Sequence, residues 1–439
     1  MWYSGLKIKT FRTGGVHPHE YKGLTEECSI INFPVPQKVI IPLSQHIGKT
    51  AKALVKKGDM VSEYQLIGQK DGKISANVHS SIPGKVVDVV MACILNYQVL
   101  SVVIQLEGEF KTGNLKKDEW EPLKKEEILK RIESAGIVGM GGAGFPTDFK
   151  LSPPPDKKID TLLVNGVECE PYLTSDYRLM MEKTDEIVEG IKIVKKVLGV
   201  RTVFLGIELN KKKAIKKFKD RLTSESNIHV VPLKVKYPQG GEKQLIKAIL
   251  KRQVPSGGLP FDVGVIVSNI ATVYAVREAV LFQKPLTERV VTVAGTIVEK
   301  CGNYKIRVGT TVSEVIKEVG IHGPIGKVIM GGPMMGINVS TVEAPVMKGT
   351  SGILFFSEKE ARSIDYSFYK PCIHCSKCLE ACPVNLNPSM LSILGEMEKW
   401  EDMKGYHLQD CIECGCCSFV CPSRRPIVGW VKAGKALSA

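Results

Sequence analysis

Two cysteine motifs near the end of the 439-residue chain constrain its fold more than any other feature. They read CIHCSKCLEACP, residues 372–383, and CIECGCCSFVCP, residues 411–422. Each has the spacing Cys-x2-Cys-x2-Cys-x3-Cys-Pro, in which three close thiolates hold one iron–sulfur cubane and the fourth reaches a neighbouring cluster. The repeat therefore predicts a domain that folds around two 4Fe-4S clusters.

The crossed pattern assigns each cluster three cysteines from one motif and one from the other. The first cluster is assigned Cys372, Cys375, Cys378 and Cys421, and the second is assigned Cys411, Cys414, Cys417 and Cys382. Cys416 is out of register and is expected to be a bystander. Zinc is the alternative metal for paired CxxC spacings, but a zinc ribbon does not need the third cysteine or the Cys-Pro ending.

The segment between the two motifs is helical in pattern. Met390, Leu391, Leu394 and Met397 recur at the spacing of one helix face. The cluster domain, residues 360–439, is therefore expected to be of the α-helical two-cluster ferredoxin type.

Charge and hydropathy limit the class of protein. The net charge of +14 indicates an acidic partner or an anionic membrane surface, and no nucleic-acid-binding motif accompanies it. Nine of the 13 cysteines lie between Cys372 and Cys421, and the chain opens without a secretory pattern, which favours metal over disulfides. The most apolar run, residues 86–106, contains Asp88 and three amide side chains, so it predicts two strands around Asn96-Tyr97 instead of a membrane span. A soluble protein is expected.

The rest of the chain predicts a multidomain α/β protein with three further units. Residues 1–115 carry short β-runs separated by turn residues and resemble a barrel-sandwich hybrid, without the modified lysine of the biotinyl and lipoyl members. Residues 116–283 alternate helical and strand patterns, including one helix over 178–198, and predict a parallel sheet. Residues 284–350 resemble a soluble-ligand-binding β-grasp (SLBB) module, expected to act as a spacer. Both β modules are expected to serve structure or docking.

A glycine-rich stretch, GMGGAGFPT at residues 139–147, carries the dinucleotide-binding spacing Gly139-x-Gly141-x-x-Gly144. A Rossmann turn needs a strand just before the first glycine and a helix that opens at the last. Here a helical pattern over 124–136 precedes the turn, and Phe145-Pro146 follows it. An ordinary Rossmann turn is therefore disfavoured.

Together with three later segments, this stretch resembles the flavin subunit of respiratory complex I, which holds FMN and NADH in one pocket. The segments are VNGVECEP (164–171), YPQGGEKQL (237–245) and VSNIATV (267–273), the last resembling a loop of that family. The closest resemblance is to the C-subunit family of the Rnf complex, a membrane-bound ferredoxin:NAD oxidoreductase. Members of that family add the N-terminal barrel-sandwich hybrid, the opening GGVHPHEYK (14–22) and a second cluster motif.

The resemblance implies a pocket for non-covalent FMN and for NAD(H) as substrate. Glycines would let the backbone approach phosphate and ring, Lys150 would offset phosphate charge, and Phe145 would stack on a base. Glu170 and Glu242 would bind the nicotinamide ribose or amide. The full set of implied cofactor-binding residues is Gly139, Gly141, Gly142, Gly144, Phe145, Lys150, Asn165, Glu168, Glu170, Tyr237, Gly240, Glu242, Asn269 and Thr272. Val167 and Gly241 stand at two positions that are acidic in the family, so the resemblance implies no carboxylate contact to the flavin there.

The resemblance also implies a function. The chain would be an electron-transfer subunit between NAD(H), FMN and the two clusters, at the cytoplasmic face of a bacterial membrane. It would attach peripherally through other Rnf-type membrane and ferredoxin-like subunits, without nucleic acid. One alternative is the flavin subunit of a soluble NAD-linked hydrogenase or formate dehydrogenase. The other is a cluster-bearing docking scaffold with a vestigial nucleotide pocket, which the replacements at Val167 and Gly241 motivate.

Overall fold

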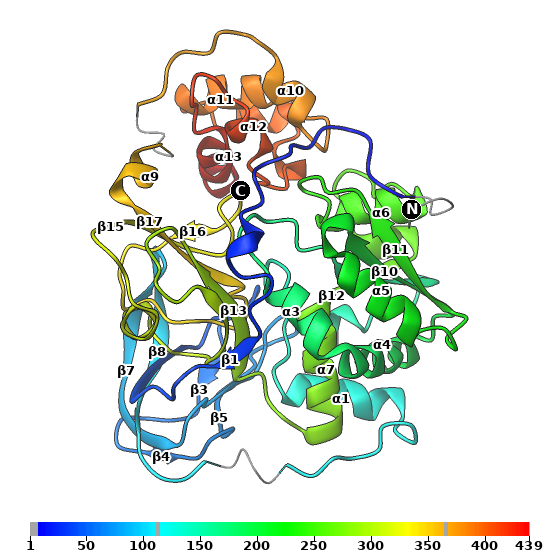
Figure 1. Cartoon of the computed structure of the whole chain (residues 1–439), viewed down its shortest axis with the longest axis vertical. Helices are drawn as coiled ribbons and strands as arrows, with labels where there is room; N and C mark the ends of the chain where they lie inside the picture. Colours follow the sequence, from blue (N-terminus) through cyan, green and yellow to red (C-terminus); the bar gives the residue numbers. More distant parts are fainter. Residues whose placement is uncertain (1–7, 111–114, 364–367, 439) are drawn as a thin grey trace.

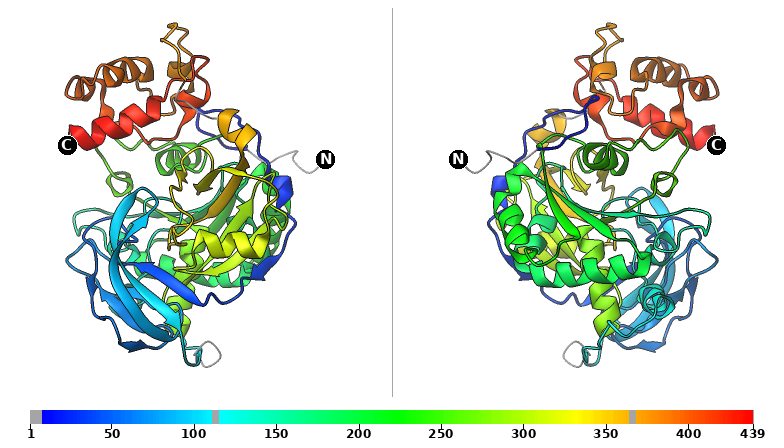
Figure 2. Two further views of the ribbon diagram at one scale, coloured as in Figure 1. Left: turned by 90° about the vertical axis from the view of Figure 1, so that its left-hand side faces the viewer. Right: turned by 90° about the vertical axis from the view of Figure 1, so that its right-hand side faces the viewer.

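The computed structural model describes residues 8–110, 115–363 and 368–438. Two β-rich regions lie beside an α/β domain, and a small helical domain sits at one end of the molecule (Figure 1). The two side views in Figure 2 show the same helical domain, coloured orange and red, standing above the rest.

A parallel sheet forms the centre of the α/β domain. It consists of β9 (Thr161–Gly166), β10 (Thr202–Glu208), β11 (Ile228–Leu233) and β12 (Val265–Asn269), in the order β11-β10-β9-β12. The chain moves outward from β9 to β11 and then returns to the other side of β9. The strand order thus reverses between β9 and β12, and in such sheets ligands bind at the carboxyl ends beside the reversal.

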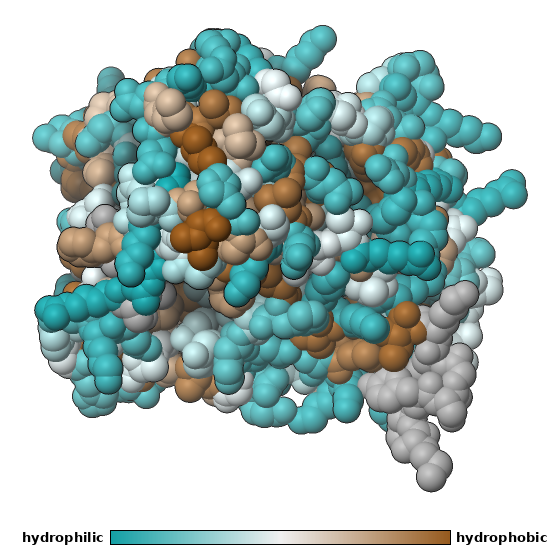
Figure 3. Space-filling model, turned by 90° about the horizontal axis from the view of Figure 1, so that it is seen from above, coloured by the Kyte–Doolittle hydropathy of each residue, from teal (hydrophilic) through white to brown (hydrophobic). Residues whose placement is uncertain are grey.

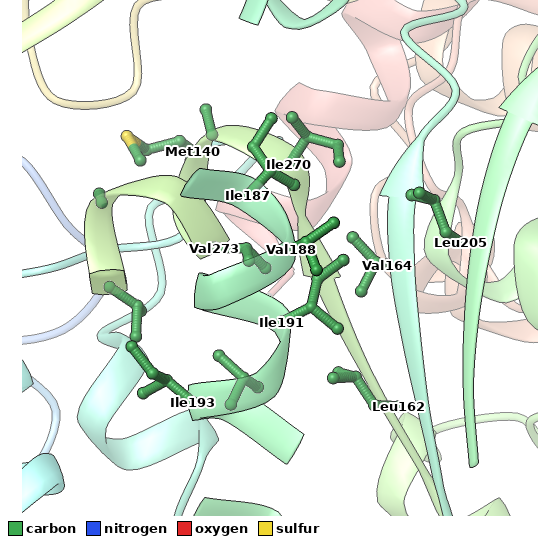
Figure 4. Close-up of a cluster of buried hydrophobic side chains, with 14 of the residues drawn as sticks. Met140, Leu162, Val164, Ile187, Val188, Ile191, Ile193, Leu205, Ile270 and Val273 are labelled. Carbon is green, nitrogen blue, oxygen red and sulfur yellow. The ribbon is translucent and has the colours of Figure 1, made fainter. Parts of the chain in front are cut away.

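Helices cover both faces of this sheet, because alternate residues of β9 point into different cores. Leu162 and Val164 belong to a core with α1 (Lys125–Ser134), α4 (Thr184–Leu198), α5 (Lys212–Arg221) and α7 (Ile270–Phe282). Leu163 belongs to a second core with α6 (Glu242–Leu250). Figure 4 shows Val188 and Ile191 of α4 facing the β9 side chains in the first core.

Two helices differ from the sequence-based expectation. The helix expected over 178–198 is two helices, α3 (Ser175–Glu182) and α4, because Lys183 leaves helical geometry with φ −126° and ψ 37°. The helix α7 begins directly at the end of β12, within the segment expected to be a loop. That expectation of a loop was wrong. The first turn of α7 packs beneath the glycine-rich stretch at residues 139–147.

The N-terminal β module is built from two small antiparallel sheets around one apolar core. Its strands are β2 (Lys38–Pro42), β3 (Lys52–Ala53), β4 (Met60–Val61), β5 (Leu66–Gln69), β6 (Val78–His79), β7 (Gly84–Ile94) and β8 (Tyr97–Leu106). The long hairpin of β7 and β8 turns at Leu95 and Asn96, which confirms the two strands expected there.

The second β-rich region is a six-stranded sheet in the order β1-β14-β13-β17-β15-β16. Its strands are β1 (Ile30–Asn32), β13 (Glu288–Ala294), β14 (Gly302–Arg307), β15 (Ile325–Met330), β16 (Ile337–Asn338) and β17 (Gly352–Ser357), and α8 (Val312–Val319) packs on it. The edge strand β1 comes from the N-terminal segment and runs parallel to β14. The helix α9 (Glu358–Ser363) follows β17.

The cluster domain is helical, as expected. Its helices are α10 (Lys377–Ala381), α11 (Pro388–Glu396), α12 (Cys416–Phe419) and α13 (Ile427–Leu437). Leu391 and Leu394 of α11 pack against Val431 of α13, so the segment between the two motifs forms the core of the domain. Among the helices of the described residues, none combines the length and apolar character needed to cross a membrane.

Candidate cofactor pocket and cluster sites

Two asparagines mark the carboxyl ends of the strands at the reversal point. Asn165 on β9 and Asn269 on β12 are direct partners in the parallel register. The Nδ2 of Asn165 donates to the carbonyl of Gly240 at 2.8 Å. Asn269 caps α7, since its Oδ1 accepts the backbone N–H of Ala271 at 2.8 Å. Both predicted residues therefore lie where an α/β sheet of this order binds its ligand.

The glycine turn lies over the first turn of α7. The N–H of Met140 donates to Oγ1 of Thr272 at 2.9 Å, and the N–H of Gly139 donates to the carbonyl of Phe145 at 2.8 Å. A Cβ on Gly141 would lie 2.9 Å from Cβ of Asn269, so only glycine fits there. A Cβ on Gly142 would have no heavy atom of the described residues within 4 Å. The turn is thus packed tightly on one side and open on the other, as a backbone cradle for a flat ring or a phosphate requires.

A charged pair stands beside this cradle. Lys150 ends the short helix α2 (Thr147–Lys150), and its Nζ lies 2.7 Å from Oε1 of Glu242, the first residue of α6. The two side chains remain 31% and 39% exposed, so both can exchange their partner for a ligand. The half-buried ring of Phe145 meets Phe149 edge-on, with ring centroids 5.8 Å apart.

Two predicted carboxylates are instead held by protein groups. Glu168 accepts the N–H of Asp176 at 2.7 Å and therefore holds the start of α3. Glu170 accepts the N–H groups of Met334 at 3.0 Å and Met335 at 2.9 Å, in the turn after β15. Burial raises the pKa of Glu170 to about 7. In this structure Glu170 joins two domains and does not line the open side of the glycine turn.

Tyr237, also predicted in the pocket, faces the cluster domain. Its side chain is buried, and its hydroxyl donates to the carbonyl of Cys414 at 2.8 Å and lies 3.3 Å from Oε1 of Glu170. Gly240, three residues later, donates its N–H to Sγ of Cys169 at 3.4 Å. Residues 237–240, which we call the tyrosine loop, thus support Asn165 on one side and contact a cluster motif on the other.

The cysteines line two adjacent cavities. Cys372, Cys375, Cys378 and Cys421 line the first, and Cys382, Cys411, Cys414 and Cys417 line the second. This grouping is the same as the crossed assignment made from the spacing. The sulfurs surround each cavity without converging on a point: among the described residues, no three His, Cys, Asp or Glu side chains are close enough to hold a single metal ion. Four thiolates around a shared space are the donor set that a cubane needs.

The two cavities differ in their surroundings. The second, which we call the inner cavity, adjoins the α/β domain through Tyr237 and through Gln244, whose Nε2 donates to the carbonyl of Pro383 at 3.4 Å. The first, the outer cavity, opens to solvent at Cys375, and Ile373 beside it is 64% exposed. Cys416 is fully buried and lines the inner cavity beside its four assigned ligands.

Two residues near the glycine turn were missed by the sequence analysis. Asp176, at the start of α3, accepts from Nδ2 of Asn269 at 2.6 Å, and burial beside Glu168 raises its pKa to about 6. Arg289 on β13 is buried with its guanidinium 3.0 Å from Sδ of Met140. Asp176 lies only five residues beyond the VNGVECEP segment and was within reach of a local argument. Arg289 comes from another sheet and had no local signal.

Four family models match the chain, in the order of its structural units. They are the RnfC barrel sandwich hybrid domain over residues 9–109, the Nuo51 FMN-binding domain over 132–278, the SLBB domain over 290–338 and the 4Fe-4S dicluster domain over 371–424. The FMN-binding match contains the glycine turn, Asn165, Glu242 and Asn269, and the dicluster match contains both cysteine motifs.

Whole-length relatives agree with these matches. The chain is 45% identical over 431 residues to the C subunit of the proton-translocating ferredoxin:NAD(+) oxidoreductase complex of Clostridium ljungdahlii, covering 97% of this chain and 93% of the relative. It is 41% identical over 434 residues to the C subunit of the Na(+)-translocating ferredoxin:NAD(+) oxidoreductase complex of Acetobacterium woodii, covering 98% and 97%. A chain of the air-oxidized NAD+-reducing [NiFe]-hydrogenase crystal structure superposes with a TM-score of 0.53 at 17% identity, over 72% of this chain and 66% of that one. At that identity the superposition shows a shared fold alone.

Proposed function

The chain belongs to the C-subunit family of ion-translocating ferredoxin:NAD(+) oxidoreductase complexes, and we propose that it carries electrons between NAD(H) and the rest of such a complex. The observation that carries the proposal is the contact between Tyr237 and Cys414, because it joins the FMN-binding domain to the inner cavity. A scaffold with a vestigial pocket would not need the open glycine cradle beside Lys150 and Glu242.

Bound FMN supplies the exchange between a two-electron hydride and one-electron clusters. The residues of the chain bind and orient the reactants. The glycine turn offers close approach to the backbone at Gly142, and Lys150 offers a cation for phosphate. Glu242 offers a carboxylate that accepts hydrogen bonds from ribose or amide groups, once its pair with Lys150 opens.

The outer cavity is the proposed port to partner subunits. Cys375 is exposed there, and Ile373 and Leu379 present apolar surface around it. Figure 3 shows this end of the molecule, where hydrophobic side chains lie among hydrophilic ones. A ferredoxin-like protein with its own cluster would dock here, and the excess of positive charge on the chain favours an acidic partner.

We call the clusters assigned to the inner and outer cavities the inner and outer clusters. The proposed order of electron transfer runs from the flavin to the inner cluster and then to the outer cluster, and this order can be tested directly. The full chain, reconstituted anaerobically with iron, sulfide and FMN, is mixed with NADH, and cluster reduction is followed by electron paramagnetic resonance. We expect Cys375→Ser to leave NADH-dependent reduction of the inner cluster intact. We expect Cys414→Ser to leave an outer cluster that dithionite reduces but NADH does not, at about four iron atoms per chain.

Two results would contradict the proposal. Wild-type clusters that dithionite reduces and NADH does not would remove the electron-transfer function and favour the docking scaffold. Reduction of the outer cluster by NADH at the wild-type rate in Cys414→Ser would reverse the proposed order of the clusters.

The proposed location is the cytoplasmic face of the membrane, with attachment through partner subunits. The motive is the net charge of +14, and electrostatic attachment weakens as salt shortens the Debye length. We expect the protein to sediment with membranes at low salt and to be released by a high-salt wash, measured by immunoblotting. Release by detergent alone would contradict peripheral attachment.

A further inference from the structure

We propose that residues 14–22, GGVHPHEYK, act as a clamp. The clamp holds the backbone at residues 381–383, which we call the inner cluster loop, against the loops at 168–173 and 237–240. It thereby sets the rate of electron transfer from the flavin to the inner cluster. The inference rests on the proposed function and adds a positioning role for a segment that the function left unexplained. We call residues 14–22 the clamp segment. In Figure 1 the dark-blue N-terminal part of the chain runs between the red-orange cluster domain and the green α/β domain.

The first end of the clamp segment lies against the inner cluster loop. Gly14 has φ +61°, and a Cβ there would lie 2.4 Å from the backbone carbon of Cys382 and 2.7 Å from the nitrogen of Pro383. The N–H of Gly15 donates to the carbonyl of Ala381 at 2.9 Å. The contact is therefore backbone against backbone, at a cysteine assigned to the inner cluster, and only glycine permits it.

The middle of the clamp segment pairs with the tyrosine loop. Val16 and Tyr237 exchange both backbone hydrogen bonds, at 2.8 Å and 2.9 Å. The side chain of Val16 packs in one apolar cluster with Tyr237, Ala381 and Cys414. Gly15 is constrained here as well, because a Cβ would lie 2.7 Å from the carbonyl oxygen of Tyr237.

The far end of the clamp segment holds the VNGVECEP loop through a buried lysine. Nζ of Lys22 donates to the carbonyls of Glu168 at 3.0 Å, Glu170 at 2.9 Å and Leu173 at 2.5 Å. Glu168 has φ +49°, a left-handed conformation that is costly outside glycine and persists only when its surroundings enforce it. An ammonium with three protons satisfies three carbonyls at once, so Lys22 holds this loop together with Lys211, whose Nζ donates to the carbonyl of Val167 at 2.7 Å.

These contacts tie three loops to one continuous stretch of nine residues. Electron transfer slows steeply as the distance between donor and acceptor grows. A small displacement of the inner cluster loop should therefore lower the rate of electron transfer. Each anchor is a backbone group or a buried side chain, which makes the clamp segment stiff. Its loosening should slow the step from flavin to inner cluster without changing hydride transfer to the flavin.

The experiment compares Gly14→Ala with Gly199→Ala in the full reconstituted chain. Gly199 has φ +64°, nearly the φ of Gly14, but a Cβ there would have no heavy atom of the described residues within 4 Å. The control therefore carries the same backbone strain without the contact. Stopped-flow absorbance follows flavin reduction by NADH, and rapid-freeze electron paramagnetic resonance follows the inner cluster.

For Gly14→Ala we expect the iron content and the rate of flavin reduction by NADH to be unchanged. The cluster step, which is electron transfer from the flavin to the inner cluster, should slow roughly tenfold or more, because small misplacements of reacting groups slow reactions by such factors. The resonance of the inner cluster should also shift, which loss of stability alone would not produce. Gly199→Ala should match the wild type. An unchanged cluster step in Gly14→Ala overturns the proposal, and so does iron loss in that variant, which would assign the segment to cluster assembly.

Lys22→Met provides a second variant that leaves the cluster loop untouched. It keeps the apolar stem and removes the three donors, so the 168–173 loop should gain hydrogen exchange while iron content stays constant. The cluster step should again slow relative to flavin reduction. Unchanged exchange and an unchanged rate would contradict the clamp. Failure of the proposed function itself is distinguishable, because it would abolish NADH-dependent cluster reduction in the wild type.

Discussion

Gly142 is the residue on which the flavin site depends most directly, because its Cβ position faces open space at the centre of the glycine turn. We expect Gly142→Val to lose FMN while keeping iron, because the branched side chain would fill the cradle without striking the protein. The measurement is flavin released from the purified chain, beside its iron content. Normal flavin and normal NADH oxidation in this variant would exclude the turn as the flavin cradle.

Glu242 gives a chemically different prediction at the same pocket. The variant Glu242→Gln keeps the shape of the side chain and removes the charge that faces Lys150 at 2.7 Å. We expect bound FMN to be retained and the NADH requirement to rise roughly tenfold to a hundredfold, because a hydrogen bond to a charged group contributes about 1.5–3 kcal/mol. Steady-state kinetics with an artificial acceptor measures this. Partial loss of flavin, with an unchanged NADH requirement in the fraction that keeps it, would move Glu242 to the flavin side of the pocket.

At the scale of elements, local patterns predicted the strands and the amphipathic helices well, and they missed α7 for a physical reason. The helix is buried on nearly every side, with Ala271, Val273 and Val276 among its core residues, so its sequence lacks a polar face. The break at Lys183 was missed because the apolar spacing continues across it. Glu170 and Tyr237 carry donors and acceptors suited to a nucleotide, but their partners come from segments distant in sequence.

The cluster motifs allow a prediction about which cysteines hold iron. Cys416 lines the inner cavity but is out of register with the repeat, whereas Cys417 keeps the spacing. We expect about eight iron atoms per chain in the wild type and in Cys416→Ser, and about half that number in Cys417→Ser. Iron analysis after anaerobic reconstitution makes the comparison. Equal losses in the two variants would contradict the assignment.

At the scale of the whole molecule, the features that the sequence could not supply are contacts between distant segments. The strand β1 completes a sheet whose other strands lie more than 250 residues later, and the clamp segment reaches the cluster domain in the same way. Neither has a local pattern, because a three-residue strand and a glycine pair acquire meaning only from the partner they meet. Domain order was predictable, and domain docking was not.

Lys348 is one such docking contact, and it makes stability depend on pH. It is buried, and its Nζ donates to the carbonyls of Asn77, in the N-terminal β module, and Gly136, before the glycine turn. Burial lowers the pKa of Lys348 to about 7, from an ordinary value of 10.5. The titratable groups facing it are His46 and His79, whose pKa values are also lowered by burial, so both are neutral above pH 7.

The sign follows from proton binding. Between pH 7 and 10.5 the unfolded chain keeps a proton on Lys348 that the folded chain releases, so the free energy of unfolding rises with pH across this window. The variant Lys348→Met removes the titration along with the two hydrogen bonds. We therefore expect it to be less stable than the wild type and the deficit to grow by about 2 kcal/mol from pH 7 to pH 9. Urea midpoints at the two pH values measure the change, and a deficit independent of pH would mean that Lys348 stays charged in the folded protein.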